Sequence, residues 1–195
     1  MPGRVTIYCI RHGQTDWNAE QRYQGQADIP LNDFGRGQAA RNGSVLRDLP
    51  IDLTKAHYVA SPLGRTVETM QIVRRQMGLD PDTFTTDPRL REVHYGHWEA
   101  KLLSDLPTLD PTGMKDRLDD PFNWRPRGGE SYADLMQRII PWVETLDQTT
   151  VVSTHGGISR TLRGHLLGMD MNNILELEVP QDKVLKISTD GMEWL

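Results

Sequence analysis

The chain has little of what several protein classes require. Cys9 is the one cysteine among 195 residues, so an intramolecular disulfide is excluded and a reducing compartment is favoured. No apolar run approaches the ~20 residues that cross a bilayer. A formal net charge of −5 gives no general attraction to nucleic acid or to an anionic membrane. We therefore expect neither as a partner, and an anionic ligand must be captured by a local group of charges.

What is present is sufficient for a globular protein. Hydrophobic residues make up 37% of the chain, and five Trp and five Tyr are among its aromatic residues, which argues against disorder. The length favours one domain that covers residues 1–195. Residues 1–4 lead directly into an apolar run, without the apolar core and cleavage site of a signal peptide. We therefore expect a cytoplasmic protein.

Short apolar runs alternate with helical stretches along the chain. Strands are expected at 5–10, 56–60, 83–86 and 150–153, and helices at 32–49, 63–77, 131–146 and 158–167. Asn32 and Ser131 are the expected N-caps of two of these helices. The order predicts an α/β fold, a three-layer sandwich with a central, mostly parallel sheet and helices on both faces.

Two regions depart from this alternation. Residues 101–130 are rich in Pro, Asp and Gly and lack a clean period, which predicts a lid-like excursion with at most short helices. Residues 175–179 alternate apolar and acidic side chains, which predicts an antiparallel strand near the end of the chain. A further hairpin is expected around 184–191.

Basic or imidazole side chains recur where the expected strands end. Arg11 and His12 follow the first strand, Arg65 follows the second, and His155 follows the strand at 150–153. The carboxyl ends of parallel strands meet at one edge of a sheet, and helix N-termini at that edge favour anions. These side chains are therefore predicted to converge on a phosphate site.

The same residues supply the parts of a phosphoryl-transfer reaction, which needs a nucleophile, positive charge around phosphate and an acid for the leaving oxygen. A neutral imidazole on His12 can attack phosphorus, and Gly13 beside it leaves out a Cβ that would crowd the substrate. Arg11 and Arg65 offer planar charged forks to phosphate oxygens. Glu92, beyond the third strand-like run, is the expected acid.

These residues carry a resemblance to the histidine phosphatase superfamily, also called the phosphoglycerate mutase-like family, that runs from residue 5 to about 195. The segments that resemble its motifs are Arg11-His12-Gly13-Gln14-Thr15 with Asn18, Gln24-Gly25 followed by Asp28 and Pro30-Leu31, Ser61-Pro62-Leu63 to Arg65, Leu90-Arg91-Glu92 with Tyr95-Gly96 and Trp98-Glu99, and Thr154-His155-Gly156-Gly157. Ala100 departs from the pattern, because the family often has Gly there.

The resemblance implies roles for particular residues. His12 would form a phosphohistidine, Glu92 would donate a proton and later activate water, and Arg11, Arg65 and His155 would form the phosphate pocket. The residues expected to bind substrate are Thr15, Asn18, Gln24, Gly25 and Gly156. No metal and no organic cofactor are implied.

The expected function is that of a phosphomonoester phosphatase acting on a small phosphorylated metabolite. A phosphoglycerate mutase is the alternative, but the mutases resembled are longer in the excursion and in the tail. Residues 101–130 also mix basic and acidic side chains, a poor cage for a multiply charged bisphosphate. Residues 127–131 resemble the phosphatase branch. A non-catalytic phosphate-recognising module is disfavoured because His12 and Glu92 are both present. The substrate and the oligomeric state stay open.

Three other interpretations are weaker. His94 and His97 lie close to Glu92 but lack a clear third metal ligand. Residues 35–40 match a dinucleotide-binding fingerprint as text, yet no strand precedes them. A cysteine phosphatase would need Arg six residues after Cys9, and Thr15 is there. Cys9 is therefore expected to be a buried core thiol.

Overall fold

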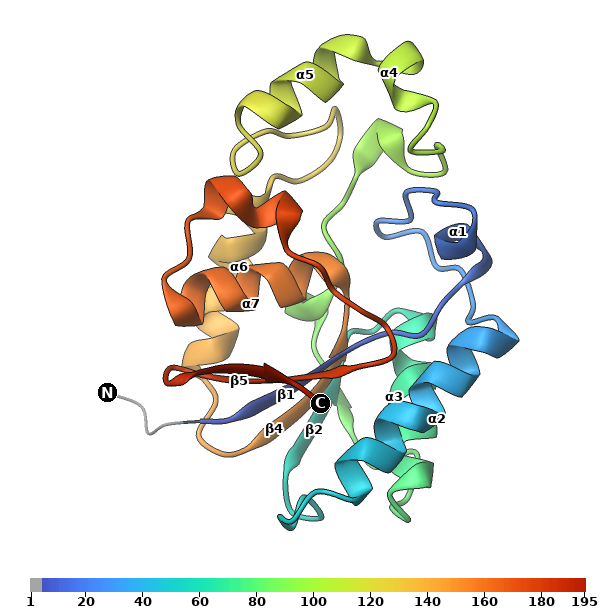
Figure 1. Cartoon of the computed structure of the whole chain (residues 1–195), viewed down its shortest axis with the longest axis vertical. Helices are drawn as coiled ribbons and strands as arrows, with labels where there is room; N and C mark the ends of the chain where they lie inside the picture. The colour runs from blue at the N-terminus through green and yellow to red at the C-terminus, as the bar shows by residue number, and fades with distance from the viewer. Residues whose placement is uncertain (1–4) are drawn as a thin grey trace.

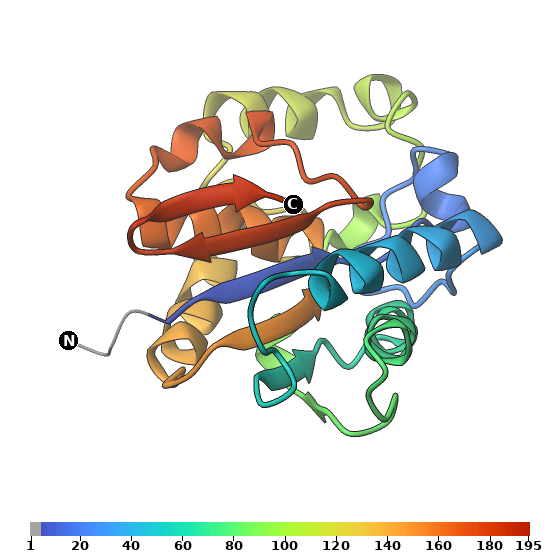
Figure 2. The ribbon, with the colours of Figure 1, turned by 60° about the horizontal axis from the view of Figure 1, so that its bottom comes forward.

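The computed structural model describes residues 5–195, and the expectation for residues 1–4 lies outside this range. Its centre is a six-stranded sheet in the order β3-β2-β4-β1-β5-β6. The strands are β1 (Ile7–Arg11), β2 (His57–Ala60), β3 (Thr85–Thr86), β4 (Thr150–Thr154), β5 (Val184–Ser188) and β6 (Gly191–Trp194). Strands β3, β2, β4 and β1 are parallel, whereas β5 and β6 are antiparallel additions at one edge (Figure 2).

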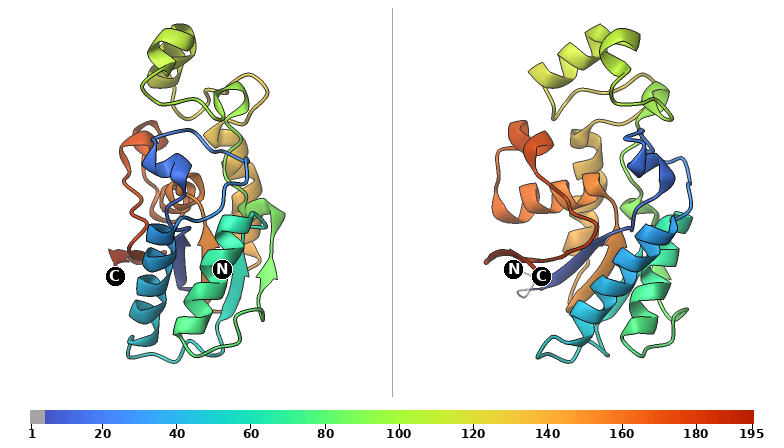
Figure 3. Two further views of the ribbon diagram at one scale, coloured as in Figure 1. Left: turned by 90° about the vertical axis from the view of Figure 1, so that its right-hand side faces the viewer. Right: turned by 45° about the vertical axis from the view of Figure 1, so that its right-hand side comes forward.

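Helices cover both faces of this sheet (Figures 1 and 3). The α-helices are α1 (Asp16–Ala19), α2 (Asp33–Arg47), α3 (Gly64–Gln76), α4 (Leu106–Leu109), α5 (Pro111–Asp119), α6 (Tyr132–Glu144) and α7 (Gly156–Leu167). Three 3-10 turns are η1 (Pro88–Leu90), η2 (Gly96–Trp98) and η3 (Met171–Glu176). Asn32 and Ser131 cap α2 and α6 as predicted.

The core is divided by the sheet into two layers, because successive strand residues point to opposite faces. Ile7 and Cys9 of β1 belong to the cluster that includes α6 and α7 residues. Tyr8 and Ile10 belong to the cluster on the other face, with apolar residues of α2 and α3. This arrangement confirms the predicted three-layer α/β sandwich with a largely parallel centre.

The parallel register sets the position of the strand ends. Arg11 at the end of β1 is paired with Thr154 at the end of β4, and Ser153 of β4 is paired with Ala60 at the end of β2. The turns that follow these three strands therefore start at the same edge of the sheet, as in other open α/β sheets.

Gly13 serves helix packing, and its predicted role in leaving room for substrate was wrong. A Cβ on Gly13 would lie 2.1 Å from the carbonyl oxygen of Gly35 in α2, and a Cβ on Gly35 would lie 2.1 Å from the carbonyl oxygen of Gln14. The turn after β1 and the first turn of α2 thus touch through their backbones. Gly35, which weakens α2 by its low helix propensity, permits this contact.

The predicted strand at 175–179 was also wrong. η3 ends at Glu176, and residues 177–181, which we call the strap, cross the molecule without a strand partner among the described residues. Three strap carbonyls accept from guanidinium groups instead of a sheet ladder. The pairs are Leu177 O with Arg160 Nε at 2.9 Å, Glu178 O with Arg163 Nη2 at 2.9 Å, and Val179 O with Arg11 Nη1 at 2.7 Å.

The excursion, residues 101–130, contains α4 and α5 and lies apart from the sheet (Figure 1). Helix α5 has nine residues and α4 has four, in line with the prediction of short helices. No helix among residues 5–195 is long and apolar enough to cross a membrane.

Candidate active site

A cavity of about 140 Å³ lies at the sheet edge where β1 and β4 end. It is lined by Arg11, His12, Asn18, Arg22, Tyr23, Gln24, Gly25, Arg65, Glu92, Tyr95, Gly156 and Arg160. Every residue predicted for the site is among them except Thr15 and His155. Residues that the chain separates by more than a hundred positions are thus brought together around one small space.

His12 presents a lone pair to this cavity. Its backbone N–H donates to Thr154 O at 2.9 Å, which extends the β1–β4 pairing by one residue. Its Nδ1 lies 2.8 Å from Gly13 O; because a carbonyl only accepts, Nδ1 carries the hydrogen and Nε2 is left with a lone pair. Burial, with the charges of Arg65 and Arg11, lowers the pKa of His12 well below its usual value. The ring is therefore a neutral base, and its Nε2 lone pair accepts a hydrogen bond from Arg65 Nε.

Arg65 connects this histidine to the loop that follows α1. Its Nε donates to His12 Nε2 at 3.3 Å, Nη1 donates to Ala27 O at 2.6 Å, and Nη2 donates to Gly25 O at 2.7 Å. Asp28 lies 3.7 Å from Nη1 and accepts from the backbone of α3. Burial lowers the pKa of Arg65, yet an arginine stays charged in proteins. The result is a fixed positive charge beside Nε2.

Arg11 has a buried donor without an acceptor. Its Nη1 is used by Val179 O of the strap, whereas Nε has no hydrogen-bond partner among residues 5–195. Leaving a buried donor unpaired costs about 1–3 kcal/mol. Burial also lowers the pKa of Arg11. A bound anion would satisfy this donor, so Arg11 fits a phosphate oxygen.

Glu92 is held at the first turn of α7. The backbone N–H of Gly157 donates to Oε1 at 3.1 Å and to Oε2 at 3.2 Å. A Cβ on Gly157 would lie 2.3 Å from Oε1, so only glycine permits this approach. Glu92 Oε2 and Arg11 Nε each lie 3.8 Å from the place that a Cβ on Gly156 would take. The carboxylate and the unpaired guanidinium donor therefore face the same point.

His155 lies beneath the cavity instead of lining it. Its Nε2 is 2.8 Å from Ser61 Oγ, its Nδ1 is 3.4 Å from Arg65 Nη2, and its ring centroid is 5.2 Å from that of His12. Burial, then the charge of Arg65, lowers the pKa of His155 well below its usual value. A neutral ring here supports Arg65 without adding charge.

Thr15 is the other predicted site residue that does not line the cavity. It caps α1: its Oγ1 accepts from Asn18 N at 3.2 Å, and its own N–H donates to Asn18 Oδ1 at 3.2 Å. Gln181 of the strap donates to Asn18 Oδ1 and to His12 O, each at 3.0 Å. Thr15 and Gln181 therefore fix Asn18, and the structure does not bring Thr15 itself to the cavity.

Four lining residues were not predicted: Arg22, Tyr23, Tyr95 and Arg160. Arg160 lies on the helix predicted at 158–167. It could have been found if that helix had been started at Gly156, where α7 begins, because Arg160 follows Gly156 by four residues and shares its face. Tyr23 is contacted by Arg117 of α5, whose guanidinium lies 5.5 Å from the Tyr23 ring and donates to its hydroxyl. No sequence pattern predicts this contact, or the contacts of Gln181 with Asn18 and His12.

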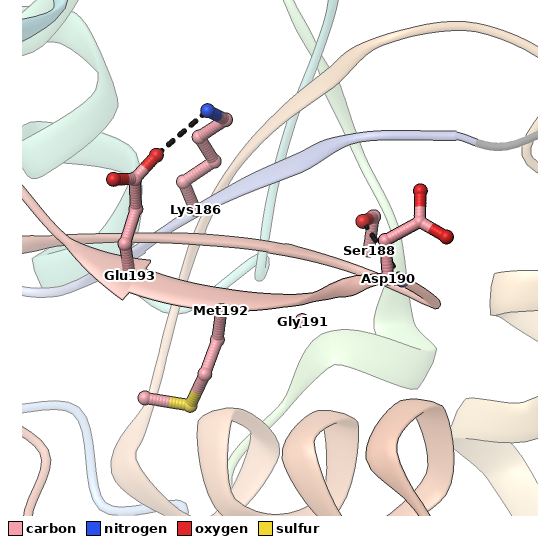
Figure 4. Close-up of a pocket in the computed structure, with 6 residues that line it drawn as sticks. All are labelled: Lys186, Ser188, Asp190, Gly191, Met192 and Glu193. Carbon is pink, nitrogen blue, oxygen red and sulfur yellow. Dashed lines mark hydrogen bonds and ion pairs between the residues drawn. The ribbon is translucent and has the colours of Figure 1, made fainter.

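The alternative sites lack the geometry they need. Among residues 5–195 no three His, Cys, Asp or Glu side chains gather as metal ligands, and His97 instead pairs with Asp110 at 2.9 Å. Cys9 is buried, and burial raises the pKa of its thiol to about 12, so it is no thiolate nucleophile. A hollow on the β5–β6 hairpin (Figure 4) contains the Lys186–Glu193 ion pair and none of the predicted site residues.

Known proteins resemble the chain over nearly its whole length. It is 31% identical to a probable phosphoglycerate mutase of Erwinia tasmaniensis, over 98% of this chain and 88% of the relative. It is 33% identical to a glucosyl-3-phosphoglycerate phosphatase of Mycolicibacterium vanbaalenii, over 86% of this chain and 76% of the relative. A solved mycobacterial glucosyl-3-phosphoglycerate phosphatase, complexed with VO3, matches with a TM-score of 0.79 at 30% identity, covering 98% of this chain and 96% of that one.

The family model described as "Histidine phosphatase superfamily (branch 1)" matches residues 7–195. This range starts with β1 and contains every residue that lines the cavity. The chain is a member of the histidine phosphatase superfamily.

Proposed function

We propose that this protein is a phosphomonoester phosphatase that passes the phosphoryl group of a small phosphorylated metabolite through His12 to water. The observation that carries the proposal is the state of His12: a neutral ring with its hydrogen on Nδ1 and a lone pair on Nε2, in a cavity that four arginines also line. Phosphoryl transfer depends mainly on such positioning and charge.

In the first step, the Arg65 Nε donor turns from His12 Nε2 to a phosphate oxygen, and the freed Nε2 attacks phosphorus while the bond from phosphorus to the leaving oxygen breaks. Protonated Glu92 gives its proton to that oxygen, so an alcohol leaves and a carboxylate remains. The Arg11 Nε and Arg65 Nε donors hold the phosphate oxygens, and each charged hydrogen bond contributes about 1.5–3 kcal/mol.

In the second step, the Glu92 carboxylate takes a proton from water as the water oxygen attacks phosphorus. The bond from phosphorus to Nε2 breaks, inorganic phosphate is released, and His12 and Glu92 return to their starting states. His155, Thr15 and Asn18 support this geometry, and Gln24, Gly25 and Gly156 line the space that phosphate would occupy. No metal and no organic cofactor takes part.

The rest of the chain serves this reaction in the proposal. Residues 1–195 act as one cytoplasmic domain, and the excursion acts as a lid over the leaving group. Similarity to a glucosyl-3-phosphoglycerate phosphatase supports a small phosphorylated substrate.

A phosphoglycerate mutase is the second candidate, and the similarity to a probable phosphoglycerate mutase favours it. The first step would be the same. The phosphoryl group would then return to a hydroxyl of the substrate instead of passing to water. The two candidates therefore differ in the acceptor and not in the nucleophile.

The proposal is tested by trapping the intermediate. Enzyme is mixed with phosphate-labelled p-nitrophenyl phosphate and, separately, with labelled 3-phosphoglycerate, and the reaction is quenched within milliseconds. We expect acid-labile, base-stable label on the peptide that contains His12. The His12→Asn variant should take up none, and His165→Asn, which alters an exposed histidine on α7, should behave as wild type.

The products then separate the two candidates. Release of inorganic phosphate supports the phosphatase, whereas phosphoglycerate with its phosphate moved to another carbon supports the mutase. Hydrolysis without any label on wild-type enzyme in the first turnover contradicts the covalent mechanism.

A further inference from the structure

Glu92 is positioned by its main chain as well as by its carboxylate. Arg138 of α6 reaches the turn that carries Glu92 and donates from Nη1 to Arg89 O and from Nη2 to Glu92 O, the latter at 3.0 Å. Gln26 donates to the same Glu92 carbonyl at 3.1 Å. One guanidinium therefore holds both ends of the segment 89–92, which ends in the proposed acid.

The same guanidinium is anchored by a carboxylate. Arg138 Nη2 lies 3.1 Å from Glu130 Oε2, and Nε lies 3.3 Å from Glu130 Oε1. Glu130 also accepts from His94 N at 3.0 Å and donates its own N–H to His94 O at 2.8 Å. The pair thus joins α6, the end of the excursion and the residues just after Glu92.

The backbones in this region leave little room for adjustment. A Cβ on Gly129 would lie 2.3 Å from His94 O, and a Cβ on Gly96 would lie 2.3 Å from Arg127 O. The segments 94–96 and 127–130 therefore cross in direct contact. A displacement of Glu130 would be passed to the turn that carries Glu92.

Arg138 and Glu130 are half-buried, with side chains 20% and 28% exposed, and neither lines the cavity. Charge-assisted hydrogen bonds of this kind are short and directional. The phosphate-binding groups are held elsewhere: Arg65 by the loop after α1, and Arg11 by the strap. Loss of Arg138 would therefore move the acid and leave the phosphate groups in place.

We propose that Arg138, anchored by Glu130, is a positioning residue that sets the distance between the Glu92 carboxyl group and the leaving oxygen. This inference rests on the role proposed for Glu92. A catalytic group displaced by about 1 Å can lose about 10²-fold in rate, and general acid catalysis is worth about 10²–10⁴-fold.

The test compares two leaving groups in the full-length enzyme. Arg138→Gln should lower kcat/KM for an alkyl phosphate such as glycerol phosphate by about 10²-fold. For p-nitrophenyl phosphate, whose phenolate leaves without a proton, the loss should stay under about 3-fold, with KM little changed for both. Arg138→Lys, which keeps one charged donor, and Glu130→Gln should show the same selectivity with smaller losses.

Arg36→Gln is the matched control. Arg36 of α2 also pairs with a carboxylate of a neighbouring helix, Glu68 of α3 at 2.7 Å, and it lies outside both the excursion and the turn that carries Glu92. This variant should keep wild-type rates on both substrates. Urea midpoints of all variants show whether each is folded, and Arg138→Lys and Glu130→Gln carry the test if Arg138→Gln unfolds.

Equal losses on the two substrates would overturn the inference. The double variant Arg138→Gln with Glu92→Gln provides a second check: it should be no slower than Glu92→Gln alone, whereas multiplied losses would indicate an independent, structural role. If the loss in Glu92→Gln itself does not depend on the leaving group, Glu92 is not the general acid and this part of the proposed function fails. If Glu92→Gln shows that dependence and Arg138→Gln does not, only the positioning role fails.

Discussion

At the end of the cavity where we propose that phosphate binds, which we call the phosphate end, the side chains of Arg11, His12, Arg65 and Glu92 each bond to backbone groups. The excursion, residues 101–130, is held in this way near its two ends, where residues 101 and 103 bond to the backbone of residues 23 and 21, and residues 127 and 130 bond to that of residues 97 and 94. Its middle is largely exposed. Helix α5 buries none of its residues, and Leu109 and Leu118 of the excursion are 59% and 70% exposed. Its attachment near the cavity is Arg117, which lies among the rings of the residues Tyr23, Trp98 and Trp124.

The difference separates two properties of the enzyme that we propose. Every phosphomonoester carries the same phosphate group. The side chains that contact it can therefore be fixed by the sheet and its flanking helices. Groups that contact the rest of the substrate lie on an exposed segment whose changes cost the core little. A fold of this kind can change substrate without changing its chemistry.

The largest effect that we expect probes the phosphate end. Glu92→Gln keeps the size of the side chain and removes the acid, so kcat for alkyl phosphates should fall by about 10²–10⁴-fold. The loss on p-nitrophenyl phosphate should be much smaller, because its leaving group needs little protonation. Steady-state kinetics on both substrates measure the ratio, and an equal loss on each would assign the acid to another residue.

A smaller and more selective effect is expected from the excursion. Arg117→Met removes the hydrogen bond to Tyr23 and a cation–π contact, so KM for a larger phosphate ester should rise by about 10-fold. The first turnover on p-nitrophenyl phosphate should be almost unaffected. Lys115→Met on the same helix, which removes an exposed ion pair with Asp119, is the control. A uniform fall in kcat on all substrates would mean that Arg117 supports the phosphate end instead of binding the rest of the substrate.

The smallest effect concerns stability. It tests whether the buried His155 ring stays uncharged in the folded protein. Burial lowers the pKa of His155 well below its usual value, so below pH ~6.5 the unfolded chain binds a proton that the folded chain does not. The free energy of unfolding should therefore fall as pH falls, by up to about 1.4 kcal/mol per pH unit for this residue.

Urea unfolding of wild type and His155→Gln at several pH values between 7.5 and 5 measures this term. The variant should lose less stability on acidification than wild type does. His165→Gln, at an exposed position of α7, should keep the wild-type slope. Equal slopes for wild type and His155→Gln would mean that the buried ring takes up its proton in the folded state.

The sequence predicted the phosphate end better than the contacts between distant segments. The strand ends and the residues Arg11, His12, Arg65 and Glu92 were predictable, because apolar runs and turn residues mark where parallel strands stop. The strap was not predictable, since the apolar and acidic side chains that alternate at 175–179 form the pattern of a strand with one buried face. Its carbonyls were taken by Arg160 and Arg163, long-range partners that no local pattern encodes.

Other parts of the site depend on the same kind of distant contact. Gln181 reaches His12 and Asn18 across more than 160 residues, and Arg138 acts through the main chain of Glu92. Neither residue type suggests a role by itself. Only the packing of α6 and the path of the strap bring them to the site.

The strap has a consequence for the order in which the site can form during synthesis. Arg11 is made 168 residues before its acceptor Val179. At about 5–20 residues per second, this interval is roughly 10–30 s. A nascent chain therefore carries Arg11 and His12 long before the strap can contact them, so these contacts of the cavity stay incomplete until residues 179–181 have been made.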